Sequence, residues 1–271
     1  MTNAAHPHDP AVRARVRWRR TRRRLIGVLV ALAGLALILA APALWLANSR
    51  PTWWPRAGPD LPAATIRARA LENGLVTLLT NIRPIDLSTG RSAPWSVAMQ
   101  ADDATAWLVA RLPQWAAQQQ RLGAWPPQIA ETRAWFGPDA LWLGARLRTS
   151  GTDQFLAARL EPEIRADGAL WLPARSISVG RLPLPAALMF SRTGTGPGFA
   201  ADMLGTDRQV PPALWQRPEA LRATRAIAGL EPLLADPSID LRDGRRVRLL
   251  SVRVEAGRLL LVCRTEWAGP R

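Results

Sequence analysis

Apolar and polar residues alternate along six short stretches in the second half of the chain. They form three pairs around turn residues: 129–136 with 140–147, 154–165 with 169–179, and 246–255 with 258–265. A two-residue period is typical of a half-buried strand, and glycine with aspartate or alanine between such runs is typical of a hairpin. The pattern therefore predicts an antiparallel sheet with one covered face and one wet face.

The stretch 168–185 shifts its apolar positions partway along. Leu170 and Leu172 lie on one side of an extended chain, whereas Ile177 and Val179 follow one step out of phase beyond Pro173. A one-residue shift of the apolar positions beside a proline predicts a β-bulge. The alternating stretch ends in Gly-Arg-Leu-Pro-Leu-Pro at 180–185.

Three stretches instead show helical periodicity: 64–80, 104–112 and 218–230. We expect Asp102 and Asp103 to cap the second helix, because carboxylates satisfy free amide groups at a helix start. The first helix carries its apolar residues along one side, and we expect it to pack on the sheet or, as the alternative, to lie on a membrane surface. These residues are Ile66, Ala70, Leu71, Leu75 and Leu78.

A longer apolar run extends from Leu25 to Ala47 without a charge. As a helix it would span about 34 Å, and a bilayer core is about 30 Å thick. Eight arginines within 13–24 precede it, against Arg50 and Arg56 shortly after it. This asymmetry predicts a single-pass anchor with a cytoplasmic N-terminus and an extracytoplasmic main domain, held in a bacterial inner membrane.

Three other interpretations fit this region less well. A cleavable signal has a shorter apolar core, although Ala41-Pro42-Ala43 resembles a cleavage site. Thr21–Leu25 resembles part of a twin-arginine signal. The arginines also suit nucleic acid, but beside an apolar helix they fit membrane topology and anionic headgroups better, and we expect no nucleic-acid partner.

The composition shift along the chain predicts four segments. They are an arginine-rich tail (1–24), a transmembrane helix (25–47), a proline-rich stalk (48–63) and an α+β domain (64–271) with a long insertion at 186–237. We expect that domain to be a curved antiparallel sheet of hairpins packed against a few helices.

Catalytic chemistry has few candidate residues outside the membrane. The formal net charge is +15, all 36 basic residues are arginines, and tyrosine is absent. Histidine occurs only at His6 and His8. These absences remove the usual general bases and nucleophiles, so we expect no enzyme, no cofactor and no metal site.

The remaining reactive side chains have simpler interpretations. Glu161 and Glu163 suit a solvated strand face better than a glycosidase or calcium site. Cys263 is the single cysteine, and its apolar neighbours predict a buried side chain.

The order of these elements resembles the YpmS-like family of membrane-anchored bacterial proteins. The resemblance covers roughly 95–265 and rests on the stretch 102–113 (Asp-Asp-Ala-Thr-Ala-Trp-Leu-Val-Ala-Arg-Leu-Pro), on Gly-Arg-Leu-Pro-Leu-Pro at 180–185, and on the closing hairpin with Asp243-Gly244-Arg245 and Gly257-Arg258-Leu259. It implies an extracytoplasmic α+β domain similar to tubular (TULIP-like) lipid-binding modules, with no catalytic residue.

Two functions follow as hypotheses. In the first, helix and sheet leave an apolar groove for a lipid tail, formed by Trp107, Leu108, Leu112, Leu170, Leu172, Ile177, Val179 and Leu182. In the second, the domain is a non-catalytic interaction module of a cell-envelope assembly. The same apolar residues would serve as ordinary core if neither holds.

Overall fold

The computed structural model describes residues 34–36, 38–118, 125–149, 152–186 and 218–267. The chain divides into two compact units, 1–46 and 47–271, which are treated separately. In the first unit, residues 34–36 and 38–46 are helical. The predicted tail (1–24) and residues 25–33 of the predicted span lie outside the described residues. Within the described part of the chain, no helix is long and apolar enough to cross a membrane, so the span stays a prediction.

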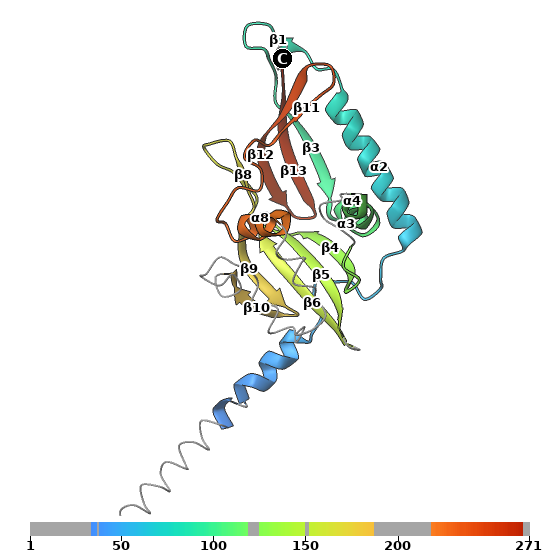
Figure 1. Ribbon diagram of the computed structural model, residues 1–271, viewed down its shortest axis with the longest axis vertical. Coiled ribbons are helices and arrows are strands. Elements are labelled where there is room, and N and C mark those ends of the chain that lie inside the picture. Colours follow the sequence, from blue (N-terminus) through green and yellow to red (C-terminus); the bar gives the residue numbers. More distant parts are fainter. Residues whose placement is uncertain (1–33, 37, 119–124, 150–151, 187–217, 268–271) are drawn as a thin grey trace, which may run out of the picture. The chain divides into compact units, whose positions relative to one another are not determined.

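The second unit consists of antiparallel sheets and a few helices, which confirms the α+β class (Figure 1). Sheet A has the order β1-β2-β13-β12-β11, with β3 also paired to β13; its strands are β1 (Ile85–Asp86), β2 (Arg91–Ser92), β3 (Trp95–Gln100), β11 (Ser238–Asp240), β12 (Arg245–Glu255) and β13 (Arg258–Trp267). Sheet B has the order β10-β9-β6-β5-β4, with strands β4 (Ile129–Phe136), β5 (Leu141–Thr149), β6 (Thr152–Leu160), β9 (Ala174–Val179) and β10 (Leu182–Pro185). A third pair joins β7 (Glu163–Ile164) to β8 (Leu170–Trp171).

The expectation of one curved sheet is therefore wrong. Strand β3 runs directly into a helix and pairs with β13 from Arg258↔Gln100 to Cys263↔Trp95. Because the closing hairpin takes β3 as its partner, the strands between 129 and 185 pair among themselves as a separate sheet.

The predicted hairpins are confirmed, and glycine supplies the left-handed backbone that two of the turns need. Gly168 joins β7 to β8 with φ +79°, and Gly257 joins β12 to β13 with φ +83°. Residues other than glycine are strained in this region, so local sequence is enough to fix these turns.

The stretch 168–185 is divided between two sheets. Pro173 lies between β8 and β9, where its carbonyl accepts a hydrogen bond from the Glu161 N–H at 3.0 Å. The predicted bulge is confirmed by a register shift between Arg159 and Leu160, opposite β9. Arg159 pairs with Ser176 and Leu160 pairs with Ala174, so the extra residue of the bulge is Arg175, two positions after Pro173.

The helices begin and end at somewhat different residues from those predicted. Helix α2 (Leu61–Thr80) begins three residues early, because Asp60 accepts a hydrogen bond from the Ala63 N–H. Helix α3 (Ala101–Ala110) has Gln100 at its N-cap without a side-chain bond, so Asp102 and Asp103 are not caps but lie in the first turn. Helix α4 (Leu112–Gln118) follows it. Helix α8 (Pro218–Ile227) ends before Gly229, whose φ is +72°.

Helices α2 and α3 pack through a seam of small side chains. Ala64 and Ala68 of α2 meet Ala106 and Ala110 of α3, and Ala68 is fully buried. The seam turns the helix away from the predicted orientation, so that Ile66 is 72% exposed. Alanine pairs allow two helices to approach closely, whereas leucine side chains at the same positions would hold the helices apart.

The C-terminal end of α2 is held by a buried arginine. The Arg245 guanidinium donates to the carbonyls of Thr80 and Asn81, at 2.9 Å each. Its charge is balanced by Asp243, whose Oδ2 lies 2.6 Å from Nη2. A cation at this position satisfies free carbonyls and complements the helix dipole. The end of α2 is thereby joined to the start of β12.

The segment predicted as a stalk (48–63) contributes two indole rings to sheet B. Trp54 is 4% exposed and packs edge-on against Phe155, with ring centroids 5.2 Å apart. Trp53 lies beside it and stacks on Trp135 at 6.3 Å. Both rings lie over Gly144, where an added Cβ would come within 2.7 Å of Trp54 and 2.8 Å of Trp53.

We predict that Gly144→Ala lowers the free energy of unfolding by about 1–3 kcal/mol, because a methyl group here overpacks two held rings. Gly74→Ala is the matched control. Gly74 is exposed on α2 with nothing within 4 Å of an added Cβ, so this change should be neutral or stabilising by up to about 1 kcal/mol. Denaturant unfolding of the full chain in detergent measures both. Equal stability of the two variants would contradict the packing of Trp53 and Trp54 on Gly144.

Candidate functional site

An apolar pocket of about 230 Å³ lies where α2, α3 and the two sheets meet. Its lining combines side chains from six elements and both sheets: Leu71, Leu75, Met99, Ala104, Trp107, Leu108, Ala134, Phe136, Leu141, Leu143 and Leu259. Protein interiors hold few voids larger than a water molecule. A pocket of this size with an apolar lining is therefore the main candidate for a binding site in the described residues.

The pocket exists because small residues face one another in an otherwise bulky neighbourhood. Ala104 of α3 and Ala134 of β4 are buried in the same core cluster as Phe136 and Leu259. Two alanines cannot fill the space between larger neighbours, so volume remains between helix and sheet.

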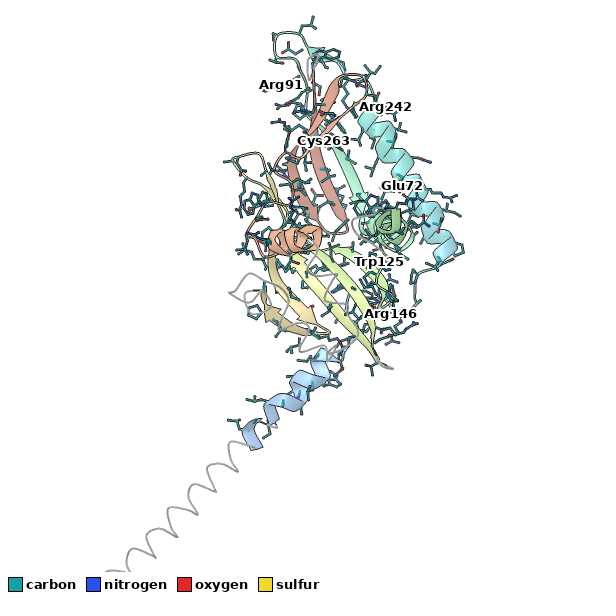
Figure 2. All side chains as sticks on the ribbon, in the orientation of Figure 1. Glu72, Arg91, Trp125, Arg146, Arg242 and Cys263 are labelled. Carbon is teal, nitrogen blue, oxygen red and sulfur yellow. The ribbon has the colours of Figure 1, made fainter. Side chains whose placement is uncertain are left out.

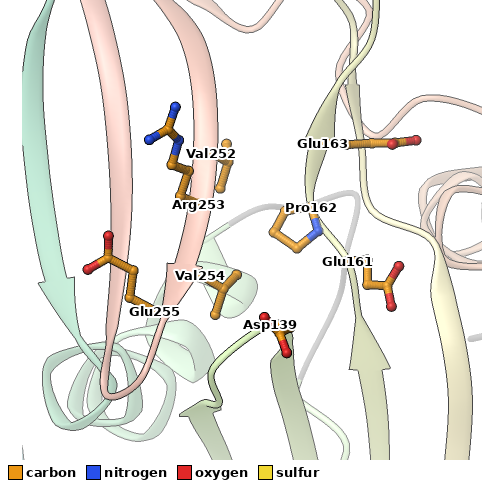
Figure 3. A pocket seen from close by; sticks show the side chains of 8 residues that line it. All are labelled: Asp139, Glu161, Pro162, Glu163, Val252, Arg253, Val254 and Glu255. Atoms are coloured by element: carbon orange, nitrogen blue, oxygen red, sulfur yellow. The ribbon is translucent and has the colours of Figure 1, made fainter.

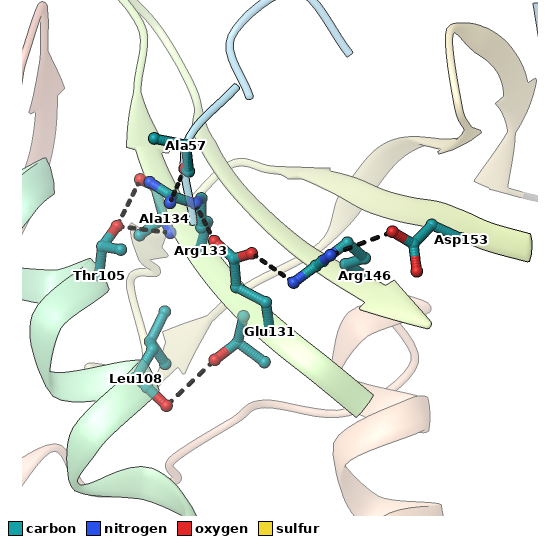
Figure 4. A network of polar contacts seen from close by, with 9 residues as sticks. Ala57, Thr105, Leu108, Glu131, Arg133, Ala134, Arg146 and Asp153 are labelled. Atoms are coloured by element: carbon teal, nitrogen blue, oxygen red, sulfur yellow. Dashed lines mark hydrogen bonds and ion pairs between the residues drawn. The ribbon is translucent and has the colours of Figure 1, made fainter. Parts of the chain in front are cut away.

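Helix α3 is held in place on the edge strand of sheet B. The Thr105 hydroxyl donates to the Ala134 carbonyl at 3.0 Å and accepts from the Ala134 N–H at 3.1 Å (Figure 4). The Thr132 hydroxyl donates to the Leu108 carbonyl at 3.0 Å. The Thr105 bonds satisfy backbone groups of β4 that an exposed edge would leave open, and the Thr132 bond satisfies the Leu108 carbonyl of α3. Together they set the position of Trp107 and Leu108.

A polar clasp lies beside the pocket. Glu72 of α2 receives three bonds from Arg111, with Nε 2.9 Å from Oε1 and 3.0 Å from Oε2, and Nη2 2.7 Å from Oε2. The Trp107 indole N–H also donates to Glu72 Oε1, at 3.1 Å. Figure 2 labels Glu72 on α2 near α3. The one polar atom of the Trp107 side chain is therefore satisfied, and the ring presents carbon to the pocket.

This clasp shifts the acidity of its members. The hydrogen bonds from Arg111 lower the pKa of Glu72, outweighing the partial burial that raises it. The same hydrogen bond raises the pKa of Arg111. Both groups are therefore charged at neutral pH, and the clasp is an ion pair between the two helices.

Two of the eight residues predicted to form a groove line this pocket, namely Trp107 and Leu108. Three others belong to sheet B: Leu182 pairs with Val179, and Ile177 pairs with Ala158. Leu143, which lines the pocket, also pairs with Ala158, from the other side of β6. Residues paired directly across an antiparallel sheet point to the same face. These three residues therefore share the pocket's face of the sheet without lining the pocket itself.

The other three predicted residues lie elsewhere. Leu170 belongs to β8 and exchanges backbone hydrogen bonds with Leu234. Leu172 is half-buried beside Pro173, and Leu112 is half-buried at the start of α4.

The remaining lining residues escaped prediction because they come from distant parts of the chain. Met99 is the second-last residue of β3, Phe136 is the last residue of β4, and Leu259 is the second residue of β13. Their apolar periodicity marks them as inward-facing, but only the pairing of β3 with β13 brings them together.

A second cavity, of about 440 Å³, lies between β12 and the β6–β7 connection (Figure 3). It is lined by acidic side chains, but arginines accompany them: Glu161 lies 2.6 Å from Arg175 and Glu163 lies 2.6 Å from Arg165. Glu255 pairs with Arg258 outside the lining. In the described part of the chain, no three acidic, histidine or cysteine side chains are arranged to hold a metal ion.

Cys263 is buried in β13, as predicted (Figure 2). Burial raises the pKa of its thiol, outweighing the effect of the nearby Arg83. A thiol in this state is a small hydrophobic side chain and a poor nucleophile.

We predict that the clasp stabilises the fold at neutral pH and that acid removes this contribution. The folded-state pKa of Glu72 is lowered, so its stabilisation is complete above its ordinary value of 4.5 and is lost as the pH falls through the lowered pKa. Urea unfolding of the wild type and Glu72→Gln at several pH values measures the difference. The free energy of unfolding of the wild type should exceed that of Glu72→Gln at neutral pH, and this excess should shrink in acid. Arg111→Gln should behave as Glu72→Gln does. A difference that does not change with pH would argue against the ion pair.

Comparisons of the chain with protein-family models, with curated proteins and with solved structures find no match. The resemblance to the YpmS-like family therefore stays a prediction that rests on short motifs. What the site does has to be argued from its own geometry.

Proposed function

We propose that this chain is a membrane-anchored, extracytoplasmic protein that binds the end of an aliphatic chain in the pocket where α2, α3 and the two sheets meet, without catalysis. The observation that carries the proposal is the apolar pocket itself. All eleven of its lining residues are hydrophobic, from Leu71 to Leu259.

The volume limits what the pocket can take. Sites for drug-sized ligands measure about 300–1,000 Å³, and this pocket is smaller at about 230 Å³. A whole lipid does not fit, whereas the terminal part of one acyl or isoprenoid chain does. The polar part of such a ligand would stay outside, since the lining offers no unpaired polar group.

The location of the protein is part of the same proposal. The charge-free run from Leu25 to Ala47 would hold the second unit within reach of a lipid source, with the arginine-rich tail in the cytoplasm. A membrane anchor and an aliphatic-chain pocket suit one another, because the ligand does not need to cross water far from a bilayer.

The test is photocrosslinking of the full chain in membrane vesicles with a phospholipid that carries a diazirine near the end of one acyl chain. Mass spectrometry then maps the labelled residues. We expect label on Leu71, Leu75 or Trp107, separate from any label within residues 25–47.

Ala104→Leu and Ala70→Leu form a matched pair for this experiment. Ala104 lines the pocket, so leucine fills it and should abolish the pocket label. Ala70 is exposed on α2, so the same change should leave the label intact. Labelling confined to residues 25–47 in the wild type would refute the pocket as a binding site.

A second candidate function, an interaction module of an envelope assembly, is favoured by the outer side of α2. Leu61, Ile66 and Val76 of this helix are 57%, 72% and 59% exposed. Exposed apolar groups gathered on one helix are typical of a protein contact.

We predict that a photoreactive amino acid at Ile66 captures one abundant protein in intact cells if this second function holds. The same amino acid at Leu87, which is 98% exposed on the turn after β1, is the control for random capture. Equal and diffuse capture at both positions would reject the α2 contact.

A further inference from the structure

We propose that the outer face of sheet B is a docking surface for an anionic bilayer, the one in which the anchor would lie. This face is called the tryptophan face and is defined by Trp53, Trp135, Trp142, Arg146, Arg148 and Arg159. The inference rests on the proposed anchoring of the chain, but not on the pocket, which lies on the opposite face of the sheet.

Strand register places these residues on one side. Trp135 pairs with Trp142, Trp142 pairs with Arg159, and residues 142, 144, 146 and 148 alternate to the same side of β5. The pocket residues Leu141 and Leu143 occupy the alternate positions and point the other way. The two faces of sheet B therefore have separate roles.

The aromatic part of the face consists of three rings in mutual contact and is partly open to solvent. Trp53 contacts both Trp135 and Trp142, with ring centroids 6.3 and 6.4 Å apart, and Trp135 contacts Trp142 at 6.3 Å. Trp135 is 37% exposed. Tryptophan is the side chain most enriched at membrane–water interfaces, because its ring is apolar and its N–H is polar.

The charged part of the face is positive. Strands β4 to β6 place Arg133, Arg146, Arg148 and Arg159 on this side, against Glu131 and Asp153, which is four positive charges against two negative. Glu131 is nearly buried, with its side chain 3% exposed, and is bracketed by Arg133 and Arg146 (Figure 4).

Asp153, whose side chain is 42% exposed, pairs with Arg146 at 3.0 Å, and Arg159 lies 4.0 Å from Glu161. Arg148 is exposed and the Arg159 side chain is 41% exposed. Guanidinium groups bind phosphate in a planar, two-point geometry, and anionic leaflets attract such clusters. Indole rings beside arginines match the boundary between acyl chains and phosphate groups.

The chain itself enters the second unit at this face. The turn at Pro51–Trp54 is closed by a hydrogen bond of 3.1 Å, and Arg181 Nε donates to the Arg50 carbonyl at 2.8 Å. Ala47 and Trp53 are six residues apart, so the chain between them spans at most about 22 Å. Trp53 therefore stays within about 22 Å of Ala47, where the predicted membrane span ends.

The experiment measures how close chosen residues lie to lipid. The full chain is placed in nanodiscs of equimolar phosphatidylcholine and phosphatidylglycerol, with a nitroxide-bearing lipid as a quencher near the headgroups. A bimane label is attached at Trp135→Cys or, in a second variant, at Arg148→Cys. Leu87→Cys is the control position, since Leu87 is 98% exposed on the turn between β1 and β2 of sheet A, and Figure 1 shows β1 at the end of the unit opposite sheet B. Wild type checks that buried Cys263, 6% exposed, does not react.

We expect several-fold stronger quenching at 135 and 148 than at 87. The excess should fall when phosphatidylglycerol is left out, and when Arg159→Gln is added to the Trp135→Cys variant. Equal quenching at all three positions would overturn the docking surface. Alkaline carbonate extraction of the same samples reports on the anchor alone, so a chain that is extracted refutes the anchor while the quenching ratio still decides the docking.

Discussion

The backbone of Gly257 joins the two sheets and the helix between them. Its N–H donates to the Phe136 carbonyl at the end of β4, at 2.9 Å, and its carbonyl accepts from the Ala101 N–H at the start of α3, at 3.1 Å. The left-handed φ of +83° that makes this geometry possible suits only glycine. The pocket lies directly beside this junction, since Phe136, Leu259 and Ala104 all line it. The fold and the candidate site therefore depend on the same two hydrogen bonds.

Local features of the fold could be predicted from the sequence, because their causes lie within a few residues. Asp-Gly and Ala-Gly turns flanked by alternating apolar and polar residues predicted the hairpins, and Pro173 predicted the bulge. The division into two sheets could not be predicted in this way. It depends on the pairing of β3 with β13, whose residues are about 160 positions apart, and no local pattern encodes that choice.

The candidate site was predictable to the same limited extent. Trp107 and Leu108 were identified because helical periodicity marks an inward side. For α2 the same reasoning selected Ile66 and Ala70, which the structure leaves exposed. Periodicity identifies apolar positions but not which of two apolar sides is covered, and on α2 the alanine seam with α3 makes that choice. Leu71 and Leu75 were marked by the same stripe and do reach the pocket.

Arg245 has a consequence for how a ligand would exchange. Helix α2 is fixed at its C-terminal end by that guanidinium and in its middle by Glu72, so neither half is free to swing away from the sheets. Passage past Leu71 and Leu75 would then depend on rotation of side chains, which occurs in picoseconds to nanoseconds when they are exposed and more slowly when packed. Uptake and release would be limited by side-chain rearrangement and by the departure of the aliphatic chain from its bilayer. They would not wait for the slower opening of a helical lid.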